Sequence, residues 1–176
     1  MMRLREGDPE AFSEIFAQYQ PGVTNYVYRL SGGNIALAED IAQQVFLSFW
    51  LHREEYDLEK PVTPLLLTMA RNAWLNAAKK ETLRKAHLAG KTAEAGEGET
   101  AAHDHRLEQK EIEDALERAL SSLEPALKEV FVLSRYQGLK YSEIGELLGI
   151  SVKTVEARLS RALRMLHDQL KDFLGK

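Results

Sequence analysis

The chain has 176 residues, no cysteine and a formal net charge of -4 at pH 7. Because it has no thiol, disulfide bridges, cysteine-ligated zinc and a thiol nucleophile are excluded. No apolar run approaches the roughly 18 residues that a membrane span needs, and the opening residues MMRLREGDPE are polar and acidic. We therefore expect an unprocessed protein that acts in the cytoplasm.

Helical periodicity dominates the sequence. Apolar residues recur at spacings of three and four almost throughout, and no stretch alternates with period two for long, which predicts an all-α protein. Turn and cap residues divide the first half into four helices, at about 9–19, 21–30, 35–55 and 65–85. The residues that mark these boundaries are Asp8, Pro9, Pro21, Gly32, Gly33, Asn34, Pro61 and Pro64. We expect Pro21 to start the second helix.

Residues 87–106 differ in composition from the rest of the chain. They are rich in Gly, Ala, Thr and Glu and hold almost no large apolar side chain. Such a segment cannot bury enough surface to offset its ordering entropy, which predicts a flexible linker. It joins two helical modules, 1–86 and 107–176, and in the second module Pro125 and Gly138 bound a further helix.

The segment YSEIGELLGISVKTVEARLSRALRML, residues 141–166, has the pattern of two closely linked helices. Gly149 predicts a tight turn, and Ser151 predicts the N-cap of the second helix. One face of that helix forms an apolar stripe of Val152, Val155, Leu159, Ala162, Leu163 and Leu166. At about 100° per residue, the opposite face carries Lys153, Thr154, Ala157, Arg161 and Arg164, flanked by Arg158 and Ser160. This layout predicts a helix-turn-helix whose second helix enters the major groove of DNA.

The basic face has a second explanation, since cations can simply be the solvated side of a bundle helix. The glycine turn, the serine cap and the position of the cations opposite the apolar stripe together favour DNA binding. Arginine in such a helix can form hydrogen bonds to guanine or to phosphates. If Glu156 reaches a base, its carboxylate would accept a hydrogen bond from cytosine N4. Gly145, in the first helix, is about 1 kcal/mol less favourable than Ala. Two explanations are open: a close crossing by the second helix, or simple tolerance of the glycine.

The N-terminal module carries two further patterns. Within ALAEDIAQQVFLSFW, residues 36–50, the side chains at core spacing are Ile41, Val45, Phe46, Phe49 and Trp50. The pattern alone assigns Asp40, Gln43 and Gln44 to solvent. The predicted fourth helix ends with the cations Lys79, Lys80, Arg84 and Lys85, which either complement the helix C-terminus or form a second DNA surface. Trp74 is either a core residue or a platform for an unpaired base.

No set of residues predicts catalysis. The sequence offers no Ser/His/Asp arrangement, no phosphate-binding glycine loop and no pair of carboxylates with a plausible cleft. His103 and His105 form a His-x-His pair that can hold a metal, but no further ligands cluster near it. We therefore expect a protein that is not an enzyme and that binds neither a metal nor a cofactor.

Several motifs in order resemble a sigma factor of the extracytoplasmic-function (ECF) group of the sigma-70 family. GDPEAF, AEDIAQQVFLSFW and LLTMARN with its basic tail resemble region two of that family. SLEPALKEVFVLSRYQGLKYSEIGELLGISVKTVEARLSRAL resembles region four. The resemblance implies that 1–86 is region two, that 107–176 is region four, and that the chain brings core RNA polymerase to promoters and helps to open the duplex.

The resemblance also assigns roles to individual residues. The helix that docks on the polymerase clamp would carry Asp40, Gln43, Gln44 and Phe46. The minus-ten element would be met by Arg71, Asn72, Lys79 and Lys80. The minus-thirty-five element would be read by Lys153, Thr154, Glu156, Ala157, Arg158 and Arg161. The loop 57–63 would hold a flipped base.

The expected partners are core RNA polymerase, promoter DNA and an anti-sigma protein, with no insertion into a membrane. The linker would lie near the RNA exit path, where its acidic residues would mimic a nucleic-acid strand in a basic channel. Those residues are Glu94, Glu97, Glu99 and Asp104.

Two other hypotheses remain open from the sequence. An autonomous DNA-binding regulator would use the same helix-turn-helix with an N-terminal dimerisation bundle, and would bind a symmetric site without polymerase. A helical interaction protein without a DNA role would tolerate charge reversal at Arg158 and Arg161. No dimer seam or ligand pocket is evident in the sequence, which favours the sigma factor.

Overall fold

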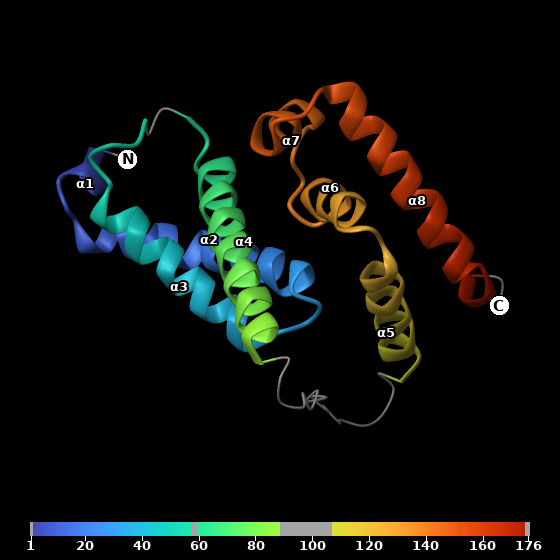
Figure 1. Ribbon diagram of the computed structural model, residues 1–176. Helices are drawn as coiled ribbons and strands as arrows, with labels where there is room; N and C mark the ends of the chain where they lie inside the picture. The colour runs from blue at the N-terminus through green and yellow to red at the C-terminus, as the bar shows by residue number, and fades with distance from the viewer. Residues whose placement is uncertain (1, 58–59, 89–106, 175–176) are drawn as a thin grey trace.

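The computed structural model describes residues 2–57, 60–88 and 107–174, and these residues form α-helices and no β-strand. The all-α prediction is confirmed (Figure 1). In chain order the helices are α1 Met2–Arg5, α2 Pro9–Leu30, α3 Ile35–Leu51, α4 Val62–Leu88, α5 Leu107–Ser122, α6 Pro125–Arg135, α7 Tyr141–Leu148 and α8 Val152–Leu174. None of the described helices combines the length and the apolar character needed to cross a bilayer.

The N-terminal module is built on α2, α3 and α4, which pack against one another. Its interior is apolar and rich in aromatic rings, and includes Tyr26, Ile41, Phe46, Phe49 and Leu66, each at most 2% exposed. Tyr56, after α3, stacks on Phe49 with ring centroids 5.5 Å apart. These residues hold the outer faces of α3 and α4 in fixed positions.

The predicted caps of this module are confirmed. Asp8 accepts a hydrogen bond from the Glu10 backbone N–H at 2.9 Å, with Pro9 at the first helical position. Asn34 accepts from the Leu37 N–H at 3.0 Å. Before it, Gly32 has φ 73°, a left-handed conformation that favours glycine at a helix end.

The prediction that Pro21 starts a new helix is wrong, since α2 runs through it without a break. Proline lacks the N–H that would bond to the carbonyl of Ala17, so it normally disfavours a helix interior. Here both Ala17 and Pro21 are exposed, and water can satisfy that carbonyl. The buried face continues on both sides of the proline, from Ile15 to Val23, and holds the helix together.

Other boundaries also differ from the predictions. The third helix ends at Leu51, and the fourth extends to Leu88, two residues into the predicted linker. The rest of that linker, with its acidic residues and the His103 and His105 pair, lies outside the described residues. A short helix before Asp8, α1, was not expected; its Arg3 binds the Asp8 carboxylate at 2.6 Å.

The C-terminal module surrounds α6, which contacts α7 and α8, while α5 packs on α8. Every residue of α6 from Leu127 to Leu133 is buried, including the charged Lys128 and Glu129. Gly138, after α6, has φ 66° and ends that segment as predicted. The helix-turn-helix therefore stands on a rigid helical base.

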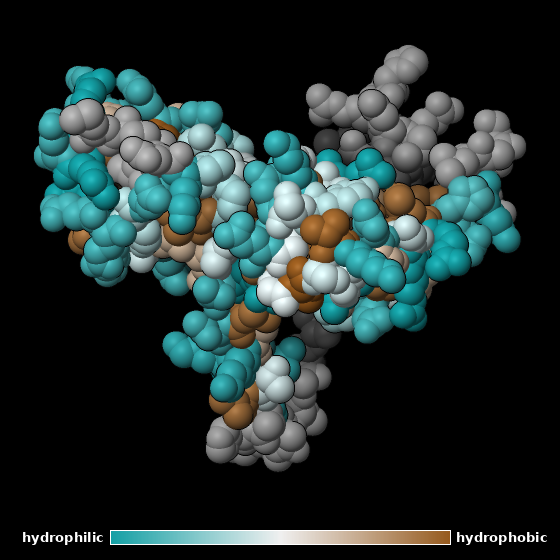
Figure 2. Space-filling model, turned by 90° about the horizontal axis from the view of Figure 1, so that it is seen from above, coloured by the Kyte–Doolittle hydropathy of each residue, from teal (hydrophilic) through white to brown (hydrophobic). Residues whose placement is uncertain are grey.

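The two modules also contact each other, because α2 packs against α6 and α4 lies beside α7 (Figure 1). Seen from above, most of the visible face is hydrophilic, with hydrophobic side chains in separate patches (Figure 2). The sequence predicted two modules but gave no sign of this contact.

Candidate nucleic-acid and polymerase interfaces

The turn between α7 and α8 is tightly built. Gly149 has φ 67°, and the Ile150 N–H bonds to the Gly145 carbonyl at 2.9 Å. A Cβ on Gly145 would lie 2.8 Å from the Ile150 carbonyl oxygen. Gly145 thus permits a close approach of backbone, but the neighbour is the turn at Ile150 and not the second helix, which was the expected neighbour.

Ser151 caps α8 as predicted, since its hydroxyl accepts from the Thr154 N–H at 3.1 Å. The apolar stripe is confirmed at its centre, where Val155, Leu159, Ala162 and Leu166 are buried. Two of its expected members lie at its margins instead: Val152 is 44% and Leu163 38% exposed.

The opposite face of α8 is open to solvent over its first three turns. Lys153, Glu156, Ala157 and Arg161 are exposed, and Thr154 and Arg158 are partly so. Within the described part of the chain, Lys153 and Arg158 have no hydrogen bond or ion pair. Arg161 lies 3.8 Å from Glu124, and both side chains are well exposed, so this pair is weak. These cations are available to an anionic partner.

A second surface lies between α3 and α4 around Asn72. This asparagine lines an open hollow of about 470 Å³ together with Gln44, Val45, Ser48, His52, Glu55, Tyr56, Met69 and Ala73. Its lining mixes hydrogen-bonding and apolar groups. Burial raises the pKa of Tyr56, whose ring forms part of the wall. The sequence predicted a functional role for Asn72 but none for His52 and Glu55, which also line the hollow. Both follow the last apolar turn of α3.

The remaining predicted minus-ten residues lie in different environments. Lys79 and Lys80 are exposed on the second half of α4. Arg71 is instead turned toward the other module, where its Nε donates to the Glu129 carboxylate at 2.8 Å. Two residues of the predicted base-binding loop, 58 and 59, lie outside the described part of the chain.

The basic end of α4 is partly neutralised by its own carboxylate. Arg84 donates two hydrogen bonds to Glu81, at 2.8 and 2.9 Å, and Lys85 lies 3.7 Å away. The hydrogen bond from Arg84 is the main cause of the lowered pKa of Glu81. The free positive charge of this helix is therefore concentrated at Lys79 and Lys80 rather than at its end.

A third surface is an apolar hollow of about 370 Å³ between α2 and α3. It is lined by Pro9, Phe12, Phe16, Gln43, Phe46, Leu47 and Trp50. Its floor is Phe46, only 1% exposed and 4.9 Å from the Phe16 ring, while Leu47 is 59% exposed at the rim. Asp40, Gln43 and Gln44 are exposed on the same helix.

The resemblance placed Gln43 and Phe46 on the polymerase-docking helix, whereas Trp50 was assigned to the core and Phe12, Phe16 and Leu47 were not assigned to this surface. Phe12 and Phe16, spaced at i and i+4, and Leu47, four residues after Gln43, extend the apolar stripes beyond the width that a buried face needs. The extra width of these apolar stripes was the feature of the sequence that could have predicted an exposed apolar surface. The described residues contain no group of three or more His, Cys, Asp or Glu side chains that could hold a metal ion.

Comparison with known proteins shows where this architecture occurs. Residues 15–84 match the family described as Sigma-70 region 2, and residues 113–166 match Sigma-70, region 4. The RNA polymerase sigma factor CarQ of Myxococcus xanthus is 32% identical over 177 aligned positions, which cover 100% of this chain and 96% of CarQ. The ECF RNA polymerase sigma factor SigL of Mycobacterium tuberculosis (strain H37Rv) is 30% identical, over 90% of this chain and 88% of SigL.

The chain belongs to the ECF sigma factors of the sigma-70 family. Its fold agrees with that of the sigma factor RpoE, solved in complex with the anti-sigma factor NepR from Bartonella quintana. The TM-score is 0.74 at 20% identity, over 92% of this chain and 98% of that one. As a sigma factor, the protein directs transcription initiation at promoters, which decides among the three hypotheses left open by the sequence.

The three surfaces fall within the two matched regions of this sigma factor. The hollow around Asn72 and most of the α2–α3 hollow lie in region two, and the exposed face of α8 lies in region four. Pro9 and Phe12 precede the matched residues, so the α2–α3 hollow extends slightly beyond the matched region.

Proposed function

We propose that each of the three surfaces has its own partner during initiation. The α2–α3 hollow docks on core RNA polymerase, the Asn72 hollow and the following lysines meet the minus-ten element, and the first turns of α8 read the minus-thirty-five element. The observation that carries this proposal is the exposed, largely unpaired cationic face of α8, held behind a capped and tightly packed turn. Under this proposal the modules 1–86 and 107–176 are regions two and four.

On α8, the proposed roles follow from charge and position. Lys153 and Thr154 are nearest the helix N-terminus, the end that reaches base edges when a recognition helix enters the major groove. Arg158 and Arg161 lie one and two turns further on, where they bond guanine or phosphates. Glu156 is exposed between them and accepts from cytosine N4.

In region two, the hollow around Asn72 is large enough for a nucleobase and offers both amide and carboxylate hydrogen-bonding groups. Single-stranded bases are commonly recognised by such a mixture of stacking walls and edge contacts. Lys79 and Lys80 lie two turns along the same helix and supply charge for the adjoining phosphates. We assign base contact to Asn72 and backbone contact to the two lysines.

The α2–α3 hollow fits a protein partner better than DNA. It is walled by aromatic and aliphatic groups together with Gln43, and Asp40 is exposed one turn before Gln43 on the same helix. Gln44 lines the Asn72 hollow instead. Protein interfaces commonly combine an apolar centre with a polar rim. We therefore assign core RNA polymerase to this surface, with Phe46 supporting it from below.

The low net charge of the chain fits this division. With a net charge of -4 the free protein attracts duplex DNA weakly, because affinity for DNA depends strongly on cations that release counterions. Specific promoter binding then depends on the polymerase. We also propose that the protein is non-catalytic, that it acts in the cytoplasm where its polymerase is, and that an anti-sigma protein binds it, as one does the related RpoE.

Run-off transcription tests this function directly. Core polymerase from the source organism is supplied with DNA from upstream of the gene for this protein, with and without the protein. We expect a specific transcript only when the protein is present, and loss of that transcript with Asn72→Ala or Arg158→Ala. Tight, polymerase-independent binding to a symmetric duplex, without any transcript, would contradict the proposal.

A further inference from the structure

The two modules are joined by three side chains, which we call the Glu129 cluster: the buried Tyr26 of α2 and Glu129 of α6, and the half-buried Arg71 of α4. The Glu129 Oε1 accepts from the Tyr26 hydroxyl at 3.0 Å and from the Arg71 Nε at 2.8 Å. The side chain of Glu129 is 11% exposed, and Tyr26 is fully buried. One carboxylate of region four therefore binds two helices of region two.

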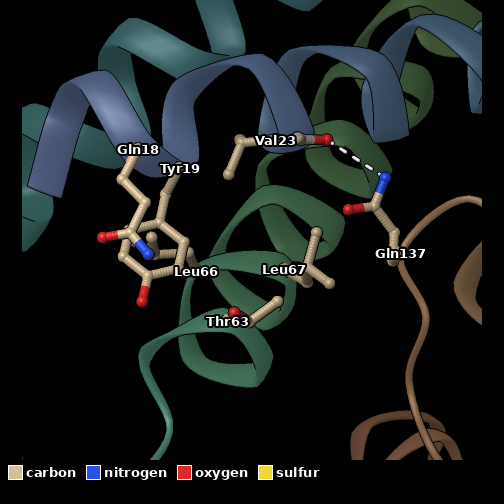
Figure 3. A pocket seen from close by; sticks show the side chains of 8 residues that line it. Gln18, Tyr19, Val23, Thr63, Leu66, Leu67 and Gln137 are labelled. Carbon is tan, nitrogen blue, oxygen red and sulfur yellow. Dashed lines mark hydrogen bonds between the residues drawn. The ribbon is translucent and has the colours of Figure 1, made fainter.

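Neighbouring contacts reinforce the junction. Arg29 forms an ion pair with Glu117, and its guanidinium lies 3.6 Å above the Tyr136 ring. Gln137 donates to the Gly22 carbonyl at 3.2 Å. This bond crosses from the loop after α6 to α2, at the edge of a small cavity of about 70 Å³ that is lined by residues of α2 and α4 and by Gln137 itself (Figure 3).

The junction continues the buried apolar cluster from one module to the other and adds a set of polar contacts. Its specific contacts are ion pairs, hydrogen bonds and one cation–π contact, and it retains a cavity. The Nε of Arg29 is buried and has no hydrogen-bond partner among the described residues. Polar and incompletely satisfied contacts between domains are typical of reversible interfaces, whereas permanent ones are larger and more apolar.

The closed arrangement is too short for the proposed promoter contacts. Elements at minus ten and minus thirty-five are roughly 25 base pairs apart, which is about 85 Å of duplex. A compact chain of 176 residues measures roughly 40 Å across. The modules must therefore separate before both elements can be bound. Separation also releases Arg71, which the closed state directs at Glu129.

We propose that the Glu129 cluster holds the free protein closed and that Arg71 exchanges Glu129 for promoter DNA when the modules separate. The effect of this closure on promoter binding rests on the proposed function. The closure of the free protein does not depend on that function. Loss of the Glu129 charge leaves the half-buried Arg71 without its ionic partner, which favours the open arrangement. The open fraction then determines the apparent affinity for the polymerase and promoter.

Distance measurements on the free, full-length protein test the closure. The chain has no cysteine, so nitroxide labels attach only at the introduced pair Ser13→Cys and Ser142→Cys, both at exposed positions of different modules. We expect one narrow distance distribution for the parent protein and an additional, longer and broader one for Glu129→Gln. Glu146→Gln removes an exposed acid from the same module and serves as the matched control.

The expected functional result is a lower apparent dissociation constant of Glu129→Gln for the polymerase–promoter complex, by up to about tenfold. The double variant Arg71→Glu/Glu129→Arg should restore the narrow distribution, which separates a specific ion pair from general loosening. Circular dichroism checks that both variants keep their helix content.

A broad distribution for the parent protein, or one unchanged by Glu129→Gln, would overturn the closure whatever the protein does in transcription. The absence of any transcript from the parent protein would overturn the proposed function and leave the distance result standing.

Discussion

Gly145 of α7 lies directly against the Ile150 carbonyl oxygen, which a Cβ at position 145 would approach to 2.8 Å. Helix propensity alone would favour Ala there by about 1 kcal/mol. The contact is with backbone and cannot be relieved by a rotamer change, so the steric effect prevails. We expect Gly145→Ala to lower the free energy of unfolding by about 1 to 3 kcal/mol. Chemical denaturation measures this, with the exposed neighbouring site Glu146→Ala as control; equal stability of Gly145→Ala and the parent would contradict the geometry.

The exposed rim of the α2–α3 hollow provides a matched pair of variants. Leu47 lines the hollow and is 59% exposed, whereas Leu51, one turn later, is 63% exposed and does not line it. A charge placed at the centre of a protein interface is left desolvated on binding. We expect Leu47→Asp to weaken binding to core polymerase by tenfold or more, on the order of an interface hot spot. Leu51→Asp should change it little. Pull-down titration with core polymerase distinguishes the two, and equal effects would place the contact elsewhere.

The exposed position of Glu156 leads to a prediction about which DNA base the protein prefers. A carboxylate accepts from cytosine N4, whereas glutamine bonds adenine N6 and N7. We expect Glu156→Gln to shift the preferred base at one position of the minus-thirty-five element from cytosine to adenine, while total transcription from the matched promoters is retained. Run-off assays on single-base promoter variants measure this shift. Arg164→Gln, further from the helix start, is the control; an unchanged preference in Glu156→Gln would show that residue 156 contacts no base.

Lys128 is a buried cation without an ion pair in the described part of the chain. Burial lowers its pKa, so the unfolded chain binds this proton more tightly than the native state does. Native stability is therefore reduced as pH falls below the unfolded pKa, and the effect is absent above about 10.5. We expect Lys128→Met to be more stable than the parent by about 1 kcal/mol at pH 7. The difference should vanish toward pH 10.5.

Thermal unfolding of the two proteins across this pH range tests the prediction. Lys171→Met removes an exposed lysine and should leave stability unchanged. A destabilised Lys128→Met at neutral pH would indicate that the ammonium group has a stabilising partner in the folded protein.

Local features were predictable from the sequence because their determinants are local. Asn34 and Ser151 cap helices through backbone groups three residues away. Gly149 adopts a left-handed backbone conformation that glycine itself favours. The continuous helix through Pro21 was missed because exposure of that residue, which makes it tolerable, depends on tertiary packing. The apolar periodicity of the sequence predicted the helices better than it predicted which helix faces are buried by tertiary packing.

The candidate site shows the same limit. The exposed cations of α8 were predicted, since a charged face opposite an apolar stripe is visible in the sequence. The pairing of Arg71 with Glu129 was not predicted, because the two residues are 58 positions apart in the sequence. The sequence pattern around an arginine does not indicate whether a distant carboxylate pairs with it. The α2–α3 hollow was predicted only in part: the resemblance named Gln43 and Phe46, but Phe12, Phe16 and Leu47 were missed because exposed and buried apolar residues share one periodicity.

The central claim, that α4 and α8 contact two separate promoter elements within one polymerase complex, is tested most directly by cleavage from tethered iron chelates. Asn76→Cys on α4 and Ser160→Cys on α8 place single labels on exposed sites beside the proposed contacts in a chain that otherwise lacks cysteine. We predict polymerase-dependent cleavage at two positions roughly 25 base pairs, or about 85 Å, apart. Cleavage by both labels at one position, or the same cleavage without polymerase, would contradict the account.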